Sequence, residues 1–152
     1  MQRSAELERT NRVKPRRFEG VAVLFCDIVG FTRYCDRREP EDVLPQLQRL
    51  VEAYEDAMGV HRMQKIKTIG DGFMAVAGLL DPVEHPVHHA VTCAADMLRI
   101  AEQVTDGWSV RIGIHEGPVV AGVLGRRQFQ FDLWGDTVNT AARVESYGVS
   151  GS

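Results

Sequence analysis

The sequence predicts an α+β fold with a ferredoxin-like βαββαβ core, in which two helices pack on one face of a mostly antiparallel sheet. The continuously apolar residues 20–27 are typical of a central strand that is buried on both faces. Residues 41–58 and 84–104 carry apolar side chains at intervals of three and four, as amphipathic helices do. Between them, residues 63–77 predict a hairpin whose two strands flank a Gly-Asp-Gly turn.

The segment after the second helix predicts the last strand of this core and then extra C-terminal elements. Apolar and polar residues alternate over residues 110–114, and the chain is expected to break at Glu116-Gly-Pro118 before a strand at 119–124. A further strand is expected at 128–132, followed by a helix over 136–146.

The 152 residues are enough for one domain with its own core, and charge is distributed unevenly along them. The net charge is −3, although residues 1–17 hold six basic and two acidic side chains. Because this segment has little apolar content, we expect a charged linker or the end of an upstream helix there. A single folded domain is then expected over residues 18–152, and its acidic balance predicts no nucleic-acid partner.

Hydropathy and cysteine content indicate a cytoplasmic protein. The longest apolar run covers only residues 21–26, whereas a membrane-spanning helix needs about 18 residues, so no membrane segment is expected in this chain. Cys26, Cys35 and Cys93 are odd in number and lack CxxC spacing, which argues against disulfides and favours a reducing compartment. Their expected role is packing.

Two aspartates lie where a carboxylate needs an explanation. Asp27 ends the buried first strand, and a carboxylate there is costly unless it is paired or coordinates a metal. Asp71 lies in the hairpin turn, where aspartate beside glycine is also a common turn residue. Because the first strand and the hairpin strands are expected to be neighbours, both carboxylates would meet at one edge. There they would suit Mg²⁺ together with substrate phosphates.

The residues after Asp27 predict a phosphate-binding turn. Val29, Gly30, Phe31 and Thr32 form a short glycine-containing segment whose backbone N–H groups are suited to face a phosphate. Together with the two carboxylates, this turn indicates two-metal phosphoryl chemistry.

Three histidines offer an alternative metal site. His85, His88 and His89 share one helical turn, but they lie at the polar start of the helix beside Glu84. Surface histidines without a carboxylate or cysteine partner are usually solvated, and we favour that interpretation.

Four motifs, taken together, resemble the catalytic domain of class III nucleotide cyclases. They occur in the family's order at residues 25–32, 65–73, 111–118 and 131–146, and span nearly all of the chain after the charged segment. The resemblance implies that Asp27 and Asp71 are metal carboxylates, with the Ile28 carbonyl as a further ligand of two Mg²⁺ or Mn²⁺ ions.

The same resemblance implies roles for two residues of the last helix. Asn139 would orient the ribose, and Arg143 would stabilise charge on the α-phosphoryl group. Their i, i+4 spacing places both on one helix face, although an exposed polar surface would have the same spacing.

Lys67 and Asp132 fall where the family reads the purine. Adenine offers an amino donor for an aspartate and a ring acceptor for a lysine, whereas guanine reverses both groups. The family's guanylate cyclases typically carry Glu and Cys at these positions, so the resemblance implies conversion of ATP to 3′,5′-cyclic AMP and pyrophosphate. The alternative is that Lys67 is an outward strand residue and Asp132 a loop residue.

The family shares each active site between two protomers, so a symmetric homodimer is implied, as is an upstream sensory or regulatory domain. Two other interpretations stay open: a catalytically incomplete cyclase-like module that binds nucleotide or pairs with another chain, and a guanylate cyclase. The first is suggested by the position of Ser152, since the family continues through further strands and a lysine that grips the triphosphate.

Overall fold

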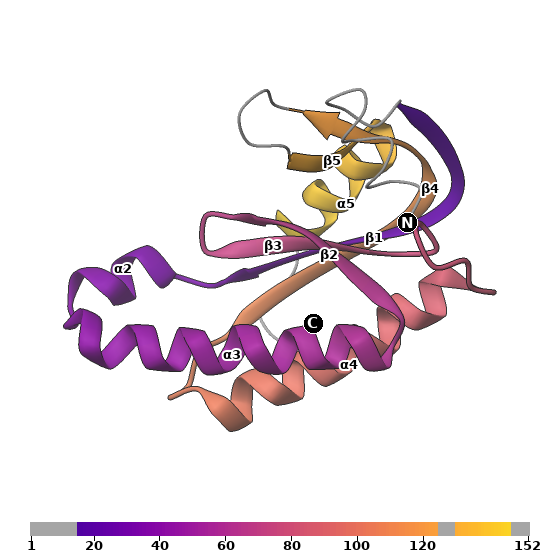
Figure 1. Ribbon diagram of the computed structural model, residues 1–152. Helices are drawn as coiled ribbons and strands as arrows, with labels where there is room; N and C mark the ends of the chain where they lie inside the picture. The colour runs from indigo at the N-terminus through magenta and orange to yellow at the C-terminus, as the bar shows by residue number, and fades with distance from the viewer. Residues whose placement is uncertain (1–14, 125–129, 147–152) are drawn as a thin grey trace.

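The computed structural model describes residues 15–124 and 130–146, and its centre is one five-stranded antiparallel sheet (Figure 1). The strand order across the sheet is β2-β3-β1-β4-β5. The strands are β1 (Arg16–Ile28), β2 (Met63–Ile69), β3 (Gly72–Ala77), β4 (Val110–Leu124) and β5 (Gln130–Trp134). This confirms the predicted α+β class, with the apolar first strand at the centre of the sheet.

Helices cover both faces of the sheet. They are α2 (Phe31–Asp36), α3 (Pro40–Val60), α4 (Pro86–Val104) and α5 (Asp136–Ser146). The two long helices, α3 and α4, lie side by side on one face, as the sequence predicts for its two amphipathic segments (Figure 1). The additional helix α5 packs on β4 and β1 from the opposite face.

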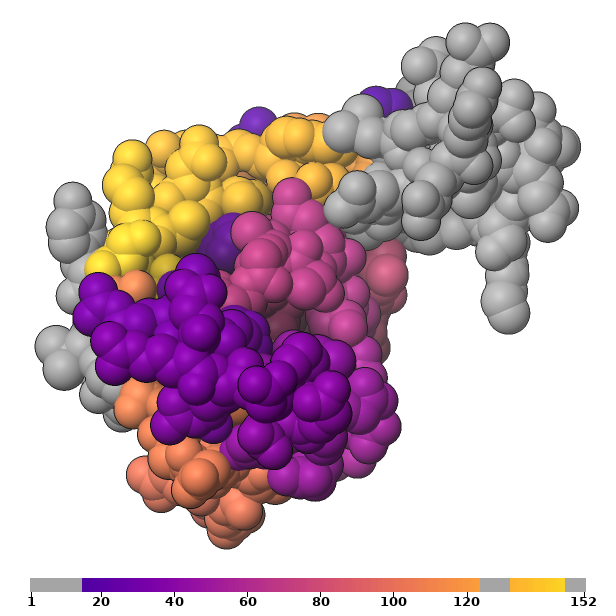
Figure 2. All heavy atoms as spheres, turned by 90° about the vertical axis from the view of Figure 1, so that its left-hand side faces the viewer, coloured from indigo at the N-terminus to yellow at the C-terminus, as the bar shows by residue number. Residues whose placement is uncertain are grey.

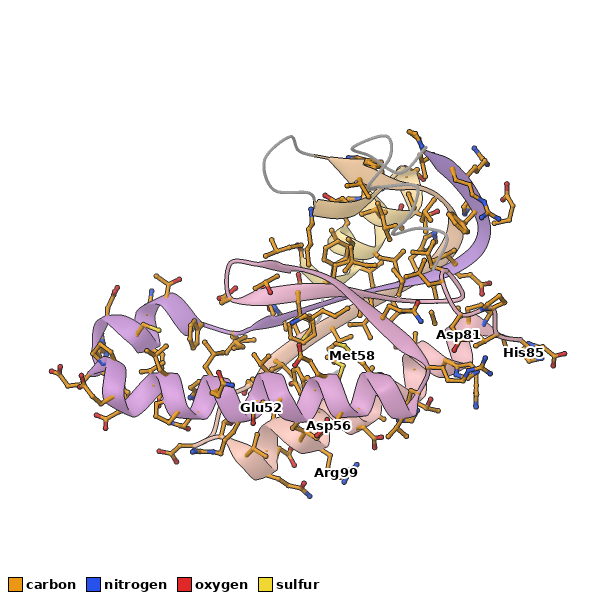
Figure 3. All side chains as sticks on the ribbon, viewed as in Figure 1. Glu52, Asp56, Met58, Asp81, His85 and Arg99 are labelled. Carbon is orange, nitrogen blue, oxygen red and sulfur yellow. The ribbon has the colours of Figure 1, made fainter. Side chains whose placement is uncertain are left out.

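Two apolar clusters, one on each face, make up the core. On the α3–α4 side, Met58 points from α3 toward the sheet (Figure 3) and is almost fully buried. Alternate residues of β1 serve the two faces, because successive side chains of a strand point in opposite directions. Ala22 and Leu24 join the α3–α4 cluster, whereas Val21 and Val23 join the α5 cluster. The need to fill both clusters explains the unbroken apolar run.

The cysteines of the sheet and of α4 have the expected packing role. Cys26 and Cys93 are free thiols buried in the α3–α4 cluster. Burial raises the pKa of both thiols, to about 12 for Cys93, so they remain protonated. Cys35 is half-buried on α2 and packs against the same cluster.

The prediction of a chain break at Glu116-Gly-Pro118 is wrong, since β4 runs without interruption. Its partner strand β1 has an irregularity between Phe18 and Val21, and Pro118 lies opposite that irregularity. A proline lacks the N–H that a regular ladder requires, and strands accept proline at bulges. One long strand therefore replaces the two short ones expected.

The boundaries of three other segments differ from expectation. β1 begins at Arg16, which pairs with Ala121, so the last residues of the expected linker belong to the sheet. Residues 1–14 lie outside the described part of the chain. The strand expected at 128–132 is described from residue 130 and continues to Trp134. The expected phosphate turn is confined to Val29 and Gly30, because α2 starts at Phe31.

Among the described helices, none is both long enough and apolar enough to span a membrane.

Candidate functional site

Asp27, at the end of the central strand β1, lies next to the hairpin turn that holds Asp71. Asp27 pairs in register with Gly72 of β3, the residue that follows Asp71. The strands approach closely at this point, because a Cβ on Gly72 would collide with the carbonyl oxygen of Cys26. Gly70 has φ 55°, which lets the hairpin turn back. The two aspartates predicted from sequence are therefore brought together by adjacent strands.

Arg111 and Glu145 lie beside Asp27, and sequence reasoning missed both. Arg111 lies opposite Asp27 on β4, and its Nη2 donates to Asp27 Oδ2 over 3.4 Å. Its Nε lies 3.5 Å from Glu145 Oε1. A signal for Glu145 was available in the sequence. It follows Thr137 and Ala141 at intervals of four, and thus lies on the buried face of α5.

Burial, together with the neighbouring carboxylates Asp27 and Asp71, raises the pKa of Glu145 from the 4.5 of a free glutamate to about 7. Arg111 opposes this rise. Asp27 in turn holds the pKa of the Arg111 guanidinium above its ordinary value. Three carboxylates, Asp27, Asp71 and Glu145, thus influence the single guanidinium of Arg111 at this end of the strands.

The donor set fits a divalent cation. Asp27 Oδ1 is buried and has no hydrogen-bond partner among the described residues, so it is free to coordinate. Carboxylate oxygens are the ligands that Mg²⁺ prefers, usually one or two per ion with water or phosphate completing the shell. No group of three or more His, Cys, Asp and Glu side chains in residues 15–124 and 130–146 could hold a metal. Metal binding here would therefore rely on Asp27 and Asp71, with water, the Ile28 carbonyl or oxygen atoms of a bound substrate completing the shell.

The segment after Asp27 is held by the loop between α4 and β4. The Val29 N–H donates to the Ser109 carbonyl over 2.8 Å, so this amide is already used. The rings of Phe31 and Tyr34 pack edge-on against Trp108, with centroids 5.3 and 5.4 Å away. Together with Ile28, these residues line a pocket of about 220 Å³. Of the predicted phosphate loop, Gly30, Phe31 and the exposed Thr32 remain as candidates for contacting a phosphate.

Lys67 and Asp132 form an ion pair, although they lie on the two outermost strands of the sheet. Lys67 Nζ donates to Asp132 Oδ2 over 2.8 Å, and the Leu133 N–H donates to Asp132 Oδ1 over 2.8 Å. Their side chains are only 28% and 13% exposed. The sheet curls enough for β2 and β5 to contact each other. Asp132 is thus a strand residue that faces Lys67, rather than a loop residue.

Asn139 and Arg143 lie together on the exposed side of α5. Both are exposed, and Arg143 Nη2 donates to Thr140 Oγ1 over 3.2 Å. Glu145, which faces Asp27, lies on the buried side of the same helix. Within one chain, the predicted ribose and phosphate residues therefore point away from the predicted metal carboxylates.

Helix α5 forms one wall of a visible depression. In Figure 2, the end of β1 (dark indigo) lies at the bottom of a hollow between α5 (yellow) and the β2–β3 hairpin (magenta).

The histidines lie elsewhere, at the start of α4. His85 and His88 are exposed, and His89 Nδ1 is 2.9 Å from the carbonyl oxygen of His61. The exposed positions of His85 and His88 agree with the solvated interpretation, whereas His89 is half-buried and its ring contacts the His61 backbone.

Comparison with known proteins gives consistent matches over nearly the whole chain. The protein-family model described as the adenylate and guanylate cyclase catalytic domain matches residues 13–152. An adenylate cyclase of Mycobacterium tuberculosis is 40% identical over 134 residues, which cover 86% of this chain and 30% of that protein. The guanylate cyclase soluble subunit beta-2 of Rattus norvegicus is 36% identical over 149 residues, which cover 95% of this chain and 22% of that protein.

One solved structure is also similar to this chain over most of its length. The guanylate cyclase domain of RhGC from Catenaria anguillulae, crystallised in complex with GTP, has a TM-score of 0.86 and 34% identity. The match covers 90% of this chain and 77% of that chain. This chain spans less than a third of the length of the two curated relatives.

Proposed function

Because this chain belongs to the family of adenylate and guanylate cyclase catalytic domains, we propose that it converts ATP to 3′,5′-cyclic AMP and pyrophosphate. The reaction takes place at two equivalent sites, each shared between the protomers of a homodimer. The relatives include both adenylate and guanylate cyclases, so the choice of ATP has to be argued from the residues themselves.

The ion pair of Lys67 and Asp132 carries the choice of base. The ammonium group donates to the N1 acceptor of adenine, and the carboxylate accepts from the N6 amino group. In the free protein the two side chains bind each other over 2.8 Å, which satisfies both partly buried charges and keeps them at one place. Guanine would oppose a donor to a donor and an acceptor to an acceptor. Sites built on such hydrogen bonds can reject the wrong partner by roughly 10⁴-fold.

Asp27 and Asp71 hold the divalent cations, together with the Ile28 carbonyl. Bound Mg²⁺ or Mn²⁺ would lower the pKa of the ribose 3′-hydroxyl and offset charge on the triphosphate. The buried Asp27 Oδ1, which has no hydrogen-bond partner among the described residues, supports this assignment. Gly30, Phe31 and Thr32 are suited to contact the phosphates from the same side of the sheet.

Asn139 orients the ribose, and Arg143 stabilises the charge that develops on the α-phosphoryl group. Both side chains are exposed and point away from Asp27 of their own chain. They therefore act on a substrate held by the metal carboxylates of a second protomer. Val144, the neighbour of Arg143 on α5, is also exposed, so an apolar side chain is available at this surface for burial in a dimer.

A guanylate cyclase is the second candidate, because the rat relative and the GTP-bound structure from Catenaria are guanylate cyclases. Lys67 and Asp132 oppose it on the grounds given above. Incubation of the dimeric protein with Mn²⁺ and either ATP or GTP decides between the two. We expect cyclic AMP from ATP and little or no product from GTP, whereas preferential formation of cyclic GMP would contradict the proposal.

The same assay addresses a catalytically incomplete module. Such a module would bind ATP in calorimetry yet form no cyclic nucleotide from either substrate. ATP binding without turnover by a confirmed dimer would therefore overturn the proposed activity.

A further inference from the structure

Arg111 occupies an intermediate position between two carboxylates. Its Nη2 lies 3.4 Å from Asp27 Oδ2, and its Nε lies 3.5 Å from Glu145 Oε1. Both distances exceed the roughly 2.7–2.9 Å of a well-formed charge-assisted hydrogen bond. Arg111 Nε and Glu145 Oε1 are buried and have no hydrogen-bond partner among the residues that the structure describes. The guanidinium is thus shared by Asp27 and Glu145 without being fully bound to either.

We propose that Glu145 is a positioning residue that sets the metal affinity of Asp27 by offering Arg111 a second carboxylate, an inference that rests on the proposed role of Asp27 as a metal ligand. A divalent cation on Asp27 would repel a guanidinium held 3.4 Å from the same carboxylate. A metal ion on the free oxygen Oδ1 therefore drives Arg111 away from the other oxygen, Oδ2. Glu145 already faces the other side of the guanidinium, so Arg111 exchanges one carboxylate for the other with a small movement.

Close packing of α5 on β4 keeps Glu145 in place for this exchange. A Cβ on Gly113 would collide with the backbone of Glu145, and a Cβ on Gly117 would collide with Thr137. The helix backbone therefore lies directly on the strand. Arg111 Nη1 also donates to the Ser146 carbonyl over 3.4 Å, at the helix end where the helix dipole is negative.

This contact joins the two functional parts of one chain. Asp27 belongs to the metal site, whereas α5 carries Asn139 and Arg143 on its other side. In a homodimer these two parts serve different active sites. Glu145 is thus placed where the metal site of one active centre contacts the substrate-binding helix of the other.

The test is a double-mutant cycle on Mn²⁺ affinity, measured by electron paramagnetic resonance without nucleotide at about pH 8. The proteins are wild type, Glu145→Gln, Arg111→Gln and the double variant. We expect Glu145→Gln to raise the Kd for Mn²⁺ about tenfold, because Arg111 then stays on Asp27. Arg111→Gln lowers the Kd. In the Arg111→Gln background, Glu145→Gln has little further effect, because no guanidinium is left to position.

A simple loss of negative charge predicts a different result. In that case Glu145→Gln weakens Mn²⁺ binding by the same factor with and without Arg111, and this additive outcome overturns the inference. Glu145→Asp separates the two explanations again, and it carries the test if Glu145→Gln does not fold. It keeps the charge but shortens the side chain, so we expect weaker binding, whereas unchanged affinity contradicts the proposal.

Two controls separate this inference from the proposed function. Glu52→Gln makes the same chemical change on the exposed side of α3, away from the sheet (Figure 3), and should leave Mn²⁺ affinity unchanged. Asp27→Asn should abolish the binding. If wild type and Asp27→Asn bind Mn²⁺ equally or not at all, the metal assignment and the inference both fail. If Asp27→Asn alone loses binding and the cycle is additive, only the inference fails.

Discussion

Lys67 and Asp132 lie on opposite edges of a five-stranded sheet, yet their side chains form an ion pair of 2.8 Å. The curl of the sheet closes the distance between β2 and β5. A donor and an acceptor are thereby fixed side by side, which is the pattern that the Watson–Crick edge of adenine requires.

Exchange of this pair should weaken the preference for ATP. In Lys67→Glu with Asp132→Cys, the donor becomes an acceptor and the carboxylate is lost. We expect the ratio of kcat/KM for ATP over GTP to fall by at least about tenfold. The control is Lys65→Gln, since Lys65 pairs with Glu55 of α3 and not with Asp132. A double variant that keeps the full ATP preference would show that these residues do not read the base.

Loss of either metal carboxylate should stop turnover while leaving the fold intact. Asp27→Asn and Asp71→Asn preserve side-chain shape but remove the charge that holds a divalent cation. We expect cyclic AMP formation to fall by more than about 100-fold. Asp56→Asn, at an exposed position of α3 (Figure 3), is the matched control and should retain activity. Activity that survives in both active-site variants would contradict the two-metal assignment.

Two inactive variants should restore activity when they are mixed. Asp27→Asn lacks a proposed metal carboxylate, and Arg143→Ala lacks the proposed phosphate contact on the exposed side of α5. If each active site takes one part from each protomer, a mixed dimer contains one intact site. An equal mixture should then recover about a quarter of wild-type activity after exchange of protomers. No recovery from a mixture shown to contain mixed dimers would mean that one chain supplies the whole site.

The metal-free protein should lose stability as pH rises from about 4.5 to about 7. The pKa of Glu145 is raised from 4.5 to about 7 in the folded state by burial, by Asp27 and by Asp71. The folded state therefore holds this proton more tightly than the unfolded state, and the resulting stabilisation is complete only at low pH. Its loss has a slope of at most about 1.4 kcal/mol per pH unit. Urea unfolding in EDTA measures it.

Glu145→Gln should flatten that pH dependence and be more stable than wild type at about pH 8, because the amide carries no charge to bury. Glu145 is coupled to Asp27, Asp71 and Arg111, so the difference between the two profiles reports this cluster as a whole. Identical profiles for the two proteins would contradict the burial argument.

Gly113 should tolerate no side chain. Its missing Cβ leaves room for the backbone of Glu145, so Gly113→Ala has to push α5 away from β4. We expect a loss of about 1–3 kcal/mol in the free energy of unfolding, together with lower activity. Gly59→Ala is the control, because a Cβ at Gly59 meets no atom within 4 Å, and alanine favours the helix. Equal stability of the two variants would argue against the close contact.

Local patterns predicted the elements well, because each depends on neighbouring residues only. The apolar run of β1 and the periodicity of α3 and α4 were enough to give the class and order of the core. Pro118 misled the prediction, since its tolerance depends on an irregularity in a different strand, β1. The short helix α2 was missed because six residues give too little periodicity to distinguish it from a turn.

For the candidate site, the sequence by itself determined which residue types are present: two aspartates after strands, a polar pair on one helix, and Lys67 and Asp132 at the positions expected to read the purine. Only the tertiary structure decided which of them meet. The curl of the sheet joins Lys67 to Asp132, and the packing of α5 on Gly113 brings Glu145 to Arg111 and Asp27. Such contacts join residues far apart in the chain. They depend on how whole strands and helices pack, which no local pattern of residues encodes.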